Sequence, residues 1–396
     1  MSVMAPVVYP ISGLLGGSGG AMFAETVNFD GAHLPNWRKA FADTLFGVSD
    51  TIVNFIGDST SAGVIAIGTA TAVYTNGRAQ SFPALLAQYL NSIGVPAIAD
   101  NWFGDANSST HSSNLTAYYP QVTLGSGWAS FTAGGVGFVP GGYAIANSTT
   151  TNNLATASRS QCDSATIFYM QSPSTGSFTW QADSGTVSSA INTSNSTSGV
   201  ALLNVSLGSV GTHTLNIART AGSVYIVGVD FYNSAKKQIR MRNFGIGGSQ
   251  TSDWVYANYG WSIGNQIDKS TFAASLSFVD LGINDWIDNN SLSSMQANLV
   301  TLYGKIAAAG GDIVIIDPLP SNPSAVSTAT QAQYTSVIRA LAQSQSLAMF
   351  DLNLRMVSYN NAVSQGFMGS GDNYHGTFEG YGDTARRLAH LLMNGT

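Results

Sequence analysis

The segment NFIGDSTSAG, residues 54–63, places Ser59 three residues after Ile56, the end of a short apolar run. A serine hydroxyl becomes a nucleophile only when a general base accepts its proton, and that base needs a group that orients it. Asp58 and Ser59 are also residue types that begin helices after strands, so Ser59 can equally be a helix cap. The segment therefore predicts acyl-transfer chemistry only if other parts of the chain supply the partners.

A base and its orienting carboxylate stand together near the end of the chain. In GDNYHGTFEGYGDTARRLA, residues 371–389, Asp372 lies three residues before His375 in a glycine-rich loop that precedes a predicted helix. We expect His375 to be the general base and Asp372 to orient it; the alternative is a histidine with a structural role. The remaining histidines lack such a context or lie inside a predicted helix: His33, His111, His213 and His390.

Two segments can stabilise the negative charge of an acyl-transfer intermediate. RNFGIGGSQTSDW, residues 242–254, holds Gly245, Gly247 and Gly248, where a bare backbone can point N–H groups at a substrate. LGIND, residues 281–285, places Asn284 just after a predicted strand, at the edge where open α/β sheets bind ligands. The alternative for both segments is an ordinary turn. Their common position at strand ends favours the oxyanion site.

Strands and helices alternate around these segments. Apolar runs predict strands at 51–56, 277–281, 312–317 and 347–352. Helical spacing predicts helices at 82–93, 292–309, 331–344 and 379–393. This alternation predicts a parallel sheet that helices cover on both faces, the α/β class.

The middle of the chain predicts a different architecture. Residues 118–237 contain short β-prone runs separated by Gly, Ser, Asn and Thr, and no convincing helix. We expect an antiparallel, jelly-roll-like β-sandwich inserted into the α/β domain, and a candidate carbohydrate-binding module. Its aromatic residues Trp128, Trp180 and Tyr225 can stack on sugar rings, although core packing is the commoner role. Residues 1–47, rich in Gly and Pro at their start, are expected to be a lead-in segment.

The composition excludes several classes of function. Charged residues make up 9% of the 396 residues, the net charge is -6, and no basic cluster offers a surface for nucleic acid. No apolar run has the ~18 residues of a membrane span. The single cysteine, Cys162, predicts a buried thiol. We expect no cofactor and no metal, because Asp372 and His375 are the one His-plus-acid cluster in the sequence.

The order GDS, NFGIGG, GIND, DNYH resembles the four sequence blocks of the SGNH hydrolases, the GDSL esterase family. The resemblance covers about residues 48–112 and 238–394, with Thr60 in place of the leucine of the first block. It implies a flavodoxin-like three-layer α/β/α sandwich at 48–117 and 238–396. It also implies that Ser59 is the nucleophile, that His375 is the base and that Asp372 is the partner of the base. The implied oxyanion donors are the backbone N–H groups of Ser59 and Gly248, with Gly247 as the alternative to Gly248, and the side chain of Asn284.

The resemblance also suggests a substrate. Relatives with long insertions remove acetyl groups from cell-wall or capsular glycans, and some of them are virion-associated. We therefore expect a serine esterase that cleaves O-acetyl groups from a carbohydrate through an acyl-enzyme. The alternatives are a short-chain esterase or lipase acting on simple esters and a non-catalytic glycan-binding virion protein.

Further expectations concern contacts and location. Trp286, two residues from Asn284, and Asp58 are expected to contact the substrate. The substrate partner is an acylated glycan or a small ester, and a virion or homo-oligomer assembly is a further expectation. The N-terminus lacks the pattern of a secretory signal, and we expect an extracellular or virion-associated protein such as a phage tail component.

Overall fold

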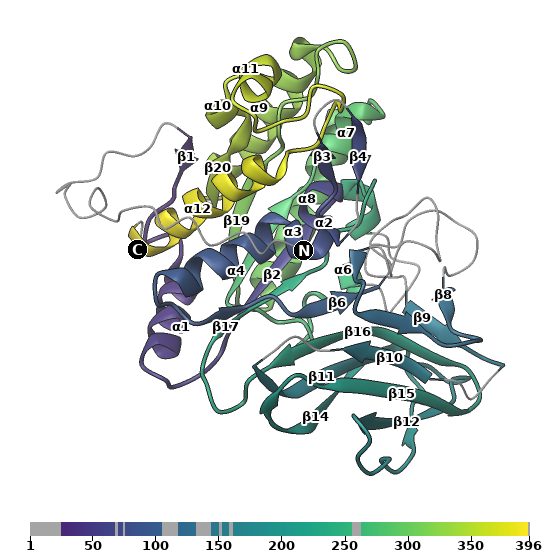
Figure 1. Cartoon of the computed structure of the whole chain (residues 1–396). Coiled ribbons are helices and arrows are strands. Elements are labelled where there is room, and N and C mark those ends of the chain that lie inside the picture. Colours follow the sequence, from purple (N-terminus) through teal and green to yellow (C-terminus); the bar gives the residue numbers. More distant parts are fainter. Residues whose placement is uncertain are drawn as a thin grey trace.

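A seven-stranded sheet forms the centre of the α/β domain (Figure 1). The computed structural model describes residues 25–67, 70–73, 76–104, 118–131, 144–149, 153–157, 161–255 and 263–394. The strand order is β1-β20-β19-β18-β2-β17-β5, with bounds Thr26–Val27, Ala348–Asp351, Asp312–Asp317, Leu276–Asp280, Thr51–Gly57, Ile239–Asn243 and Ala97–Ile98. Every pairing in it is parallel except that of β1 with β20.

The connectivity of this sheet is flavodoxin-like. Counted along the chain without the short edge strands β1 and β5, the order is 2-1-3-4-5. The chain direction across the sheet reverses between β2 and β18, and open α/β sheets bind ligands outside the carboxyl ends of strands at such a point. The predicted α/β fold is therefore confirmed.

Helices cover both faces of the sheet. One face carries α1 (Pro35–Leu45), α4 (Phe82–Ser92) and α12 (Phe378–Asn394), and the other carries α7 (Ile283–Ile287), α8 (Leu292–Ala308) and α9 (Thr328–Ser344). Strand β19 shows why two layers are needed, because Val314 and Ile316 enter one buried cluster while Ile313 and Ile315 enter the other. The shorter helices are α2 (Ser59–Ala62), α3 (Gly77–Gln80), α6 (Ile263–Gln266), α10 (Leu352–Met356), α11 (Tyr359–Ser364) and the 3₁₀ turn η2 (Thr251–Trp254).

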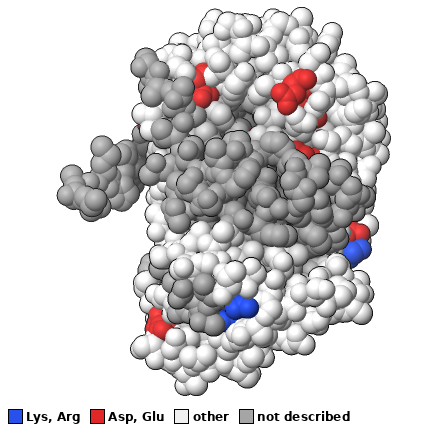
Figure 2. Space-filling model, turned by 90° about the vertical axis from the view of Figure 1, so that its right-hand side faces the viewer, with Lys and Arg blue, Asp and Glu red and all other residues white. Residues whose placement is uncertain are grey.

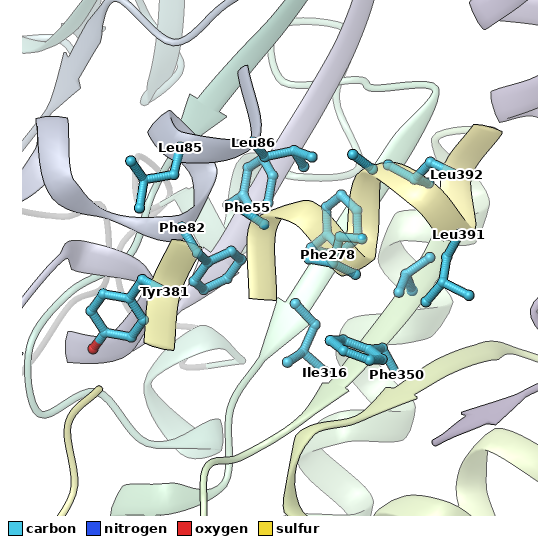
Figure 3. Packing of buried hydrophobic residues seen from close by; sticks show 14 of the residues in the cluster. Phe55, Phe82, Leu85, Leu86, Phe278, Ile316, Phe350, Tyr381, Leu391 and Leu392 are labelled. Atoms are coloured by element: carbon cyan, nitrogen blue, oxygen red, sulfur yellow. The ribbon is translucent and has the colours of Figure 1, made fainter. Parts of the chain in front are cut away.

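Aromatic side chains fill the first of these two clusters (Figure 3). Phe55 of β2 and Phe278 of β18 stack with their ring centroids 4.7 Å apart, and Phe82 of α4 meets Phe55 edge-on at 5.7 Å. All three are fully buried. Packing of this kind fixes β2 against β18, the two strands whose ends carry predicted site residues.

The middle of the chain forms two antiparallel sheets on one side of the α/β domain (Figure 1). One has the order β13-β12-β15-β10-β7, with bounds Ile191–Asn192, Ser177–Ala182, Thr214–Ala221, Asn153–Ala157 and Val122–Leu124. The other has the order β14-β11-β16-β9-β8, with bounds Gly199–Gly211, Cys162–Gln171, Val224–Tyr232, Ala144–Asn147 and Ala129–Phe131, and β6 (Asn101–Phe103) also pairs with β16. A separate hairpin joins β3 (Ile65–Ile67) and β4 (Ala70–Val73).

The two antiparallel sheets enclose a third buried cluster. Ile167 and Val229 come from one sheet and Phe178 and Ile217 from the other, so the sheets pack face to face as a sandwich. Cys162 is buried in the same cluster, as predicted. Strand β6 joins this sandwich although it precedes the predicted boundary at residue 118. The jelly-roll-like topology of the module remains a prediction.

The aromatic residues of the sandwich serve mainly as packing. Trp128 is 5% exposed inside the third cluster, and Trp180 packs against that cluster while partly buried. Tyr225 packs against the cluster beneath α8 and α9. These positions favour core packing over sugar stacking, the alternative stated for them above.

The predicted lead-in segment is wrong over residues 26–45. β1 extends the central sheet beside β20, and α1 buries Trp37 completely against the first cluster. The Trp37 backbone N–H also donates to the Asp312 carboxylate at 2.7 Å. The prediction relied on the Gly and Pro residues at the start of the chain, whereas these long-range contacts hold residues 26–45 in the α/β domain. Residues 1–24 lie outside the described residues.

A buried cluster of charges joins the sandwich to the α/β domain. Asp230 of β16 accepts from Arg240 at 2.7 Å and from Arg242 at 3.0 Å, both on β17 of the central sheet. The Arg240 guanidinium also lies 3.7 Å from the ring centroid of Tyr232. Asp230 and both arginines are buried. Arg240 also lies 3.6 Å from Asp50, so Asp230 is the nearer counter-charge of Arg240, and it is the carboxylate that pairs with Arg242.

We predict that Asp230→Asn destabilises the protein by about 3–5 kcal/mol, because it removes the counter-charge of buried Arg242 and leaves Arg240 with only Asp50, at 3.6 Å. Urea unfolding measures the free energy. The matched control is Asp43→Asn, which removes the exposed partner of Lys39 and should cost under about 1 kcal/mol. Equal stability losses in the two variants would contradict the role assigned to Asp230.

Candidate active site

Ser59 stands at a sharp strand-to-helix turn. β2 ends at Gly57, α2 begins at Ser59, and the Asp58 carboxylate caps the helix by accepting from the Thr60 N–H at 2.9 Å. A Cβ on Gly57 would lie 2.3 Å from the Ser61 hydroxyl oxygen, so only glycine fits this turn. Ser59 is thus both a residue of the helix start and a side chain at the carboxyl end of β2, with 9% of its surface exposed.

The structure brings Ser59, His375 and Asp372 into one hydrogen-bonded row. The Ser59 Oγ lies 2.8 Å from His375 Nε2, and His375 Nδ1 lies 3.0 Å from Asp372 Oδ1. A carboxylate only accepts, so Nδ1 carries the proton and the Nε2 lone pair faces the serine hydroxyl. This tautomer is the one that a general base needs.

Asp372 is held in its charged form. Partial burial raises the pKa of its carboxyl, but hydrogen bonds from the His375 ring and from the backbone N–H groups of Tyr374 and His375 outweigh burial and lower the pKa to about 2. Those backbone bonds measure 2.7 and 2.6 Å. The carboxylate therefore stays ionised beside the imidazole at any pH at which a histidine can act as a base.

Three contacts hold the loop that carries Asp372 and His375. The Tyr359 hydroxyl donates to the carbonyl of Asp372 at 2.7 Å, and the Asn322 N–H donates to the carbonyl of Asn373 at 2.9 Å. On the other side, the Ala66 N–H of β3 donates to the carbonyl of Gly376 at 3.0 Å. The loop is therefore fastened on both sides of the histidine.

The glycine segment after β17 lies beside the same turn. Gly248 has a left-handed φ of 79°, a conformation that favours glycine. The neighbouring Ser249 hydroxyl donates to the carbonyl of Gly57 at 3.1 Å, which ties the segment to the turn before Ser59. Gly245 serves packing instead, because a Cβ there would lie 2.5 Å from the backbone nitrogen of Ala62.

Asn284 joins this arrangement from α7, which begins just after β18. Its side-chain amide donates to the carbonyl of Ser249 at 2.9 Å, so the segments after β17 and β18 are bonded to each other. A carboxamide nitrogen carries two N–H groups, and this bond uses one of them. Among the described residues the second N–H makes no hydrogen bond, and the oxyanion role of Asn284 stays a prediction.

The predicted substrate contact of Trp286 is wrong. Trp286 is 1% exposed, packs in the cluster beneath α8 and α9, and donates its indole N–H to the Ser321 hydroxyl at 3.0 Å. Successive helical residues turn by about 100°, so a residue two positions from Asn284 faces nearly the opposite side of α7. Proximity in sequence therefore pointed to the wrong face.

Asp58 does not contact substrate either. Its side chain is fully buried, and its position is set by the cap of α2. Burial and the nearby charge of Asp280 raise the pKa of the Asp58 carboxyl well above its usual range. Asp58 therefore supports the turn from within.

The structure adds two His-plus-acid pairs that the sequence did not indicate. His33 Nδ1 lies 2.7 Å from Asp30, and His213 Nδ1 lies 2.8 Å from Asp183. The other ring nitrogen of His213 faces the carbonyl of Ser209 at 2.7 Å, so this pair has no serine to activate. His111 lies outside the described residues.

Sequence reasoning missed residues that hold the site together. Asp285 accepts from the backbone N–H of Thr251 at 3.0 Å and from its hydroxyl at 2.8 Å, which fixes α7 against η2. Its position next to Asn284 could have indicated it. No local signal could have indicated Tyr359, because its contact with Asp372 depends on the folded loop.

Two cavities lie away from Ser59. One of about 440 Å³ lies among α4, β5 and residues such as Gln238, and one of about 320 Å³ lies between α9 and residues such as Asn353. In the part of the chain that the structure describes, no three His, Cys, Asp or Glu side chains group as metal ligands. No helix among the described residues is long and apolar enough to cross a membrane.

Comparison with known proteins identifies a family model that matches part of the chain. Residues 220–382 match the model of the GDSL-like lipase/acylhydrolase family, a stretch that contains Gly248, Asn284, Asp372 and His375. Ser59 precedes the matched stretch, and the inserted strands lie between it and the other blocks. A search of curated proteins found no match.

Three solved structures resemble this chain, the first of them over nearly its whole length. A peptidoglycan O-acetylesterase is 17% identical with a TM-score of 0.65, covering 93% of this chain and 98% of its own. A family two carbohydrate esterase from Cellvibrio japonicus is 12% identical with a TM-score of 0.28, covering 69% and 96%. An acetylxylan esterase from Geobacillus stearothermophilus is 18% identical with a TM-score of 0.31, covering 39% and 73%.

The first of these structures shows that the fold extends over nearly the whole chain. The family match covers the segment that carries the histidine and its carboxylate. Residues 220–382 are thus similar to the GDSL-like lipase/acylhydrolase family, and nearly the whole chain shares its fold with a peptidoglycan O-acetylesterase.

Proposed function

We propose that this protein is a serine esterase that removes O-acetyl groups from a carbohydrate through an acyl-enzyme. The observation that carries the proposal is the row from Ser59 Oγ to His375 Nε2 at 2.8 Å and from His375 Nδ1 to Asp372 at 3.0 Å. A serine hydroxyl aimed at a neutral, oriented imidazole is the arrangement that nucleophilic acyl transfer needs.

In the first half of the reaction, His375 takes the proton of Ser59 while the serine oxygen attacks the ester carbonyl. The tetrahedral intermediate carries its negative charge near the backbone N–H groups of Ser59 and Gly248 and the side-chain amide of Asn284. The C–O bond to the sugar then breaks, and the imidazolium returns its proton to the departing sugar oxygen. The product of this half is an acetylated Ser59.

In the second half, water replaces the sugar. His375 takes a proton from a water molecule, the water oxygen attacks the acetyl carbonyl, and the same donors stabilise the second intermediate. The bond to Ser59 breaks, the serine oxygen recovers its proton from the imidazolium, and acetic acid leaves. Asp372 keeps the imidazole in position and stabilises its cationic form throughout.

Three features support a glycan as the substrate. The protein with a TM-score of 0.65 is by name a peptidoglycan O-acetylesterase, and 93% of this chain, including the inserted strands, takes part in that similarity. Only 9% of residues are charged, and Figure 2 shows a face on which few charged side chains are visible among the described residues. Such a surface suits a neutral sugar better than a polyanion. We extend the proposal to a location outside the cell or on a phage tail, where such glycans are exposed.

We predict that wild type releases acetate from an O-acetylated glycan with a higher kcat/KM than from p-nitrophenyl acetate. Capsular and peptidoglycan samples form the panel, and acetate release is the measurement. Ser59→Ala should lose at least about 10⁴-fold of kcat on both substrate types. Turnover of the small ester alone would favour a simple esterase, and wild-type activity in Ser59→Ala would overturn the catalytic assignment.

Asn284→Ala is predicted to lower kcat by about 100- to 1,000-fold, because one of the oxyanion donors is lost. Steady-state kinetics on p-nitrophenyl acetate measures the effect. Asn290→Ala is a matched control, since Asn290 is an asparagine just after α7 whose amide bonds to Gln250. A loss in Asn290→Ala as large as in Asn284→Ala would assign the effect to packing of this region.

Asp372→Asn is predicted to lower kcat by about 10²- to 10⁴-fold, because the amide keeps an oxygen for the backbone N–H groups but loses the negative charge. The charge of Asp372 should also be visible in the pH dependence of the stability of the protein. Because the pKa of Asp372 falls from 3.8 to about 2 on folding, its contribution to stability is present above about pH 4 and is lost as the pH falls toward 2.

Wild type should therefore lose more unfolding free energy than Asp372→Asn between pH 6 and pH 3, as measured by urea unfolding at each pH. Parallel pH profiles for the two proteins would contradict the charged state assigned to Asp372. Unchanged kcat in the variant would contradict its role in orienting the base.

A further inference from the structure

Tyr374 occupies a fixed place beside the base. It lies between Asp372 and His375 in the chain, and its backbone N–H donates to the Asp372 carboxylate at 2.7 Å. Its side chain is partly buried and packs against the cluster that contains Trp286. A substitution of the side chain leaves the backbone N–H, and with it the bond to Asp372, in place.

The hydroxyl of Tyr374 differs from those of the neighbouring tyrosines. Other tyrosines around the site bond to backbone carbonyls: Tyr359 to Asp372, Tyr381 to Val64 and Tyr334 to Asn290. Among the residues that the structure describes, the Tyr374 hydroxyl has no hydrogen-bond partner and is not sealed from solvent. A partly buried tyrosine beside a catalytic histidine with an unpaired hydroxyl is placed to meet a ligand.

Asp288 supplies a complementary group on the same side. It follows Asn284 by four residues at the end of α7, so both side chains lie on one face of that turn. Its exposed carboxylate accepts from the Gln250 side chain. Burial, then the charge of Asp372 and then that of Asp288 raise the pKa of the Tyr374 hydroxyl, which therefore remains a donor.

We propose that Tyr374 and Asp288 bind the sugar ring that carries the ester. The Tyr374 hydroxyl bonds to a sugar oxygen, and the Asp288 carboxylate accepts from a sugar hydroxyl. Sugars present donors and acceptors side by side, and this pair matches both kinds. The inference rests on the proposed function and deepens it, because it names the residues that distinguish a glycan from a simple acetyl ester.

The test compares two substrates across four proteins. Wild type, Tyr374→Phe, Asp288→Asn and the control Tyr89→Phe, a half-buried tyrosine on α4, are assayed on an O-acetylated glycan and on p-nitrophenyl acetate. We expect kcat/KM for the glycan, relative to that for the small ester, to fall about 3- to 10-fold in Tyr374→Phe and about 10- to 100-fold in Asp288→Asn. The loss should be mainly in KM, and Tyr89→Phe should keep the wild-type ratio.

The results that would contradict the sugar-binding role differ from the result that would contradict the proposed function. Equal losses on both substrates in Tyr374→Phe would overturn the inference, because the tyrosine would then act through His375 and not through the sugar. Wild-type ratios in both site variants would also overturn it. If wild type hydrolyses p-nitrophenyl acetate but releases no acetate from any glycan, the proposed function fails, and the sugar-binding role fails with it.

Discussion

The register of β2 against its two neighbours is the constraint on which the site depends. Phe55 of β2 pairs with Asn243 of β17, and Gly57 pairs with Asp280 of β18. These parallel pairings decide where the segments with Ser59, Gly248 and Asn284 leave the sheet. A shift of one residue would exchange the side chains that β2 presents to the two buried clusters, so the clusters that hold the register also hold the site.

Hydrogen bonds between buried polar groups beneath the site also hold its segments in place. Asp280, 1% exposed, accepts from the Ser61 hydroxyl at 2.7 Å, and its burial raises the pKa of that carboxyl to about 7. The Ser249 and Asn284 bonds tie the other two segments to the same turn. The rate of acyl transfer increases most when the oxyanion donors do not have to reorganise during the reaction. The hydrogen bonds beneath the site limit the motion of these donors.

The inserted β-sandwich is bonded to the α/β domain by several contacts. Asp230 holds two arginines of the central sheet, and β6, which follows the edge strand β5 of that sheet in the chain, pairs with β16 of the sandwich. β17, whose end carries the glycine segment, is therefore paired with β2 and β5 in the central sheet and bonded to the sandwich through its two arginine side chains. A glycan that contacts the sandwich would meet a surface held rigidly to the site.

The sequence by itself determined the elements and the residues of the hydrogen-bonded row. Strand and helix periods are local properties, and residues that follow parallel strands must gather at one edge of the sheet, so Ser59 and Asn284 could be inferred to meet. The spacing of Asp372 and His375 and the family resemblance indicated the base. Only the tertiary structure decided which side chains near them face the substrate. Trp286 turns inward because of its rotation on α7, and Asp58 is covered by the elements around its turn. Such orientations, like the pairing of His213 with Asp183, depend on contacts between distant segments, which no local pattern records.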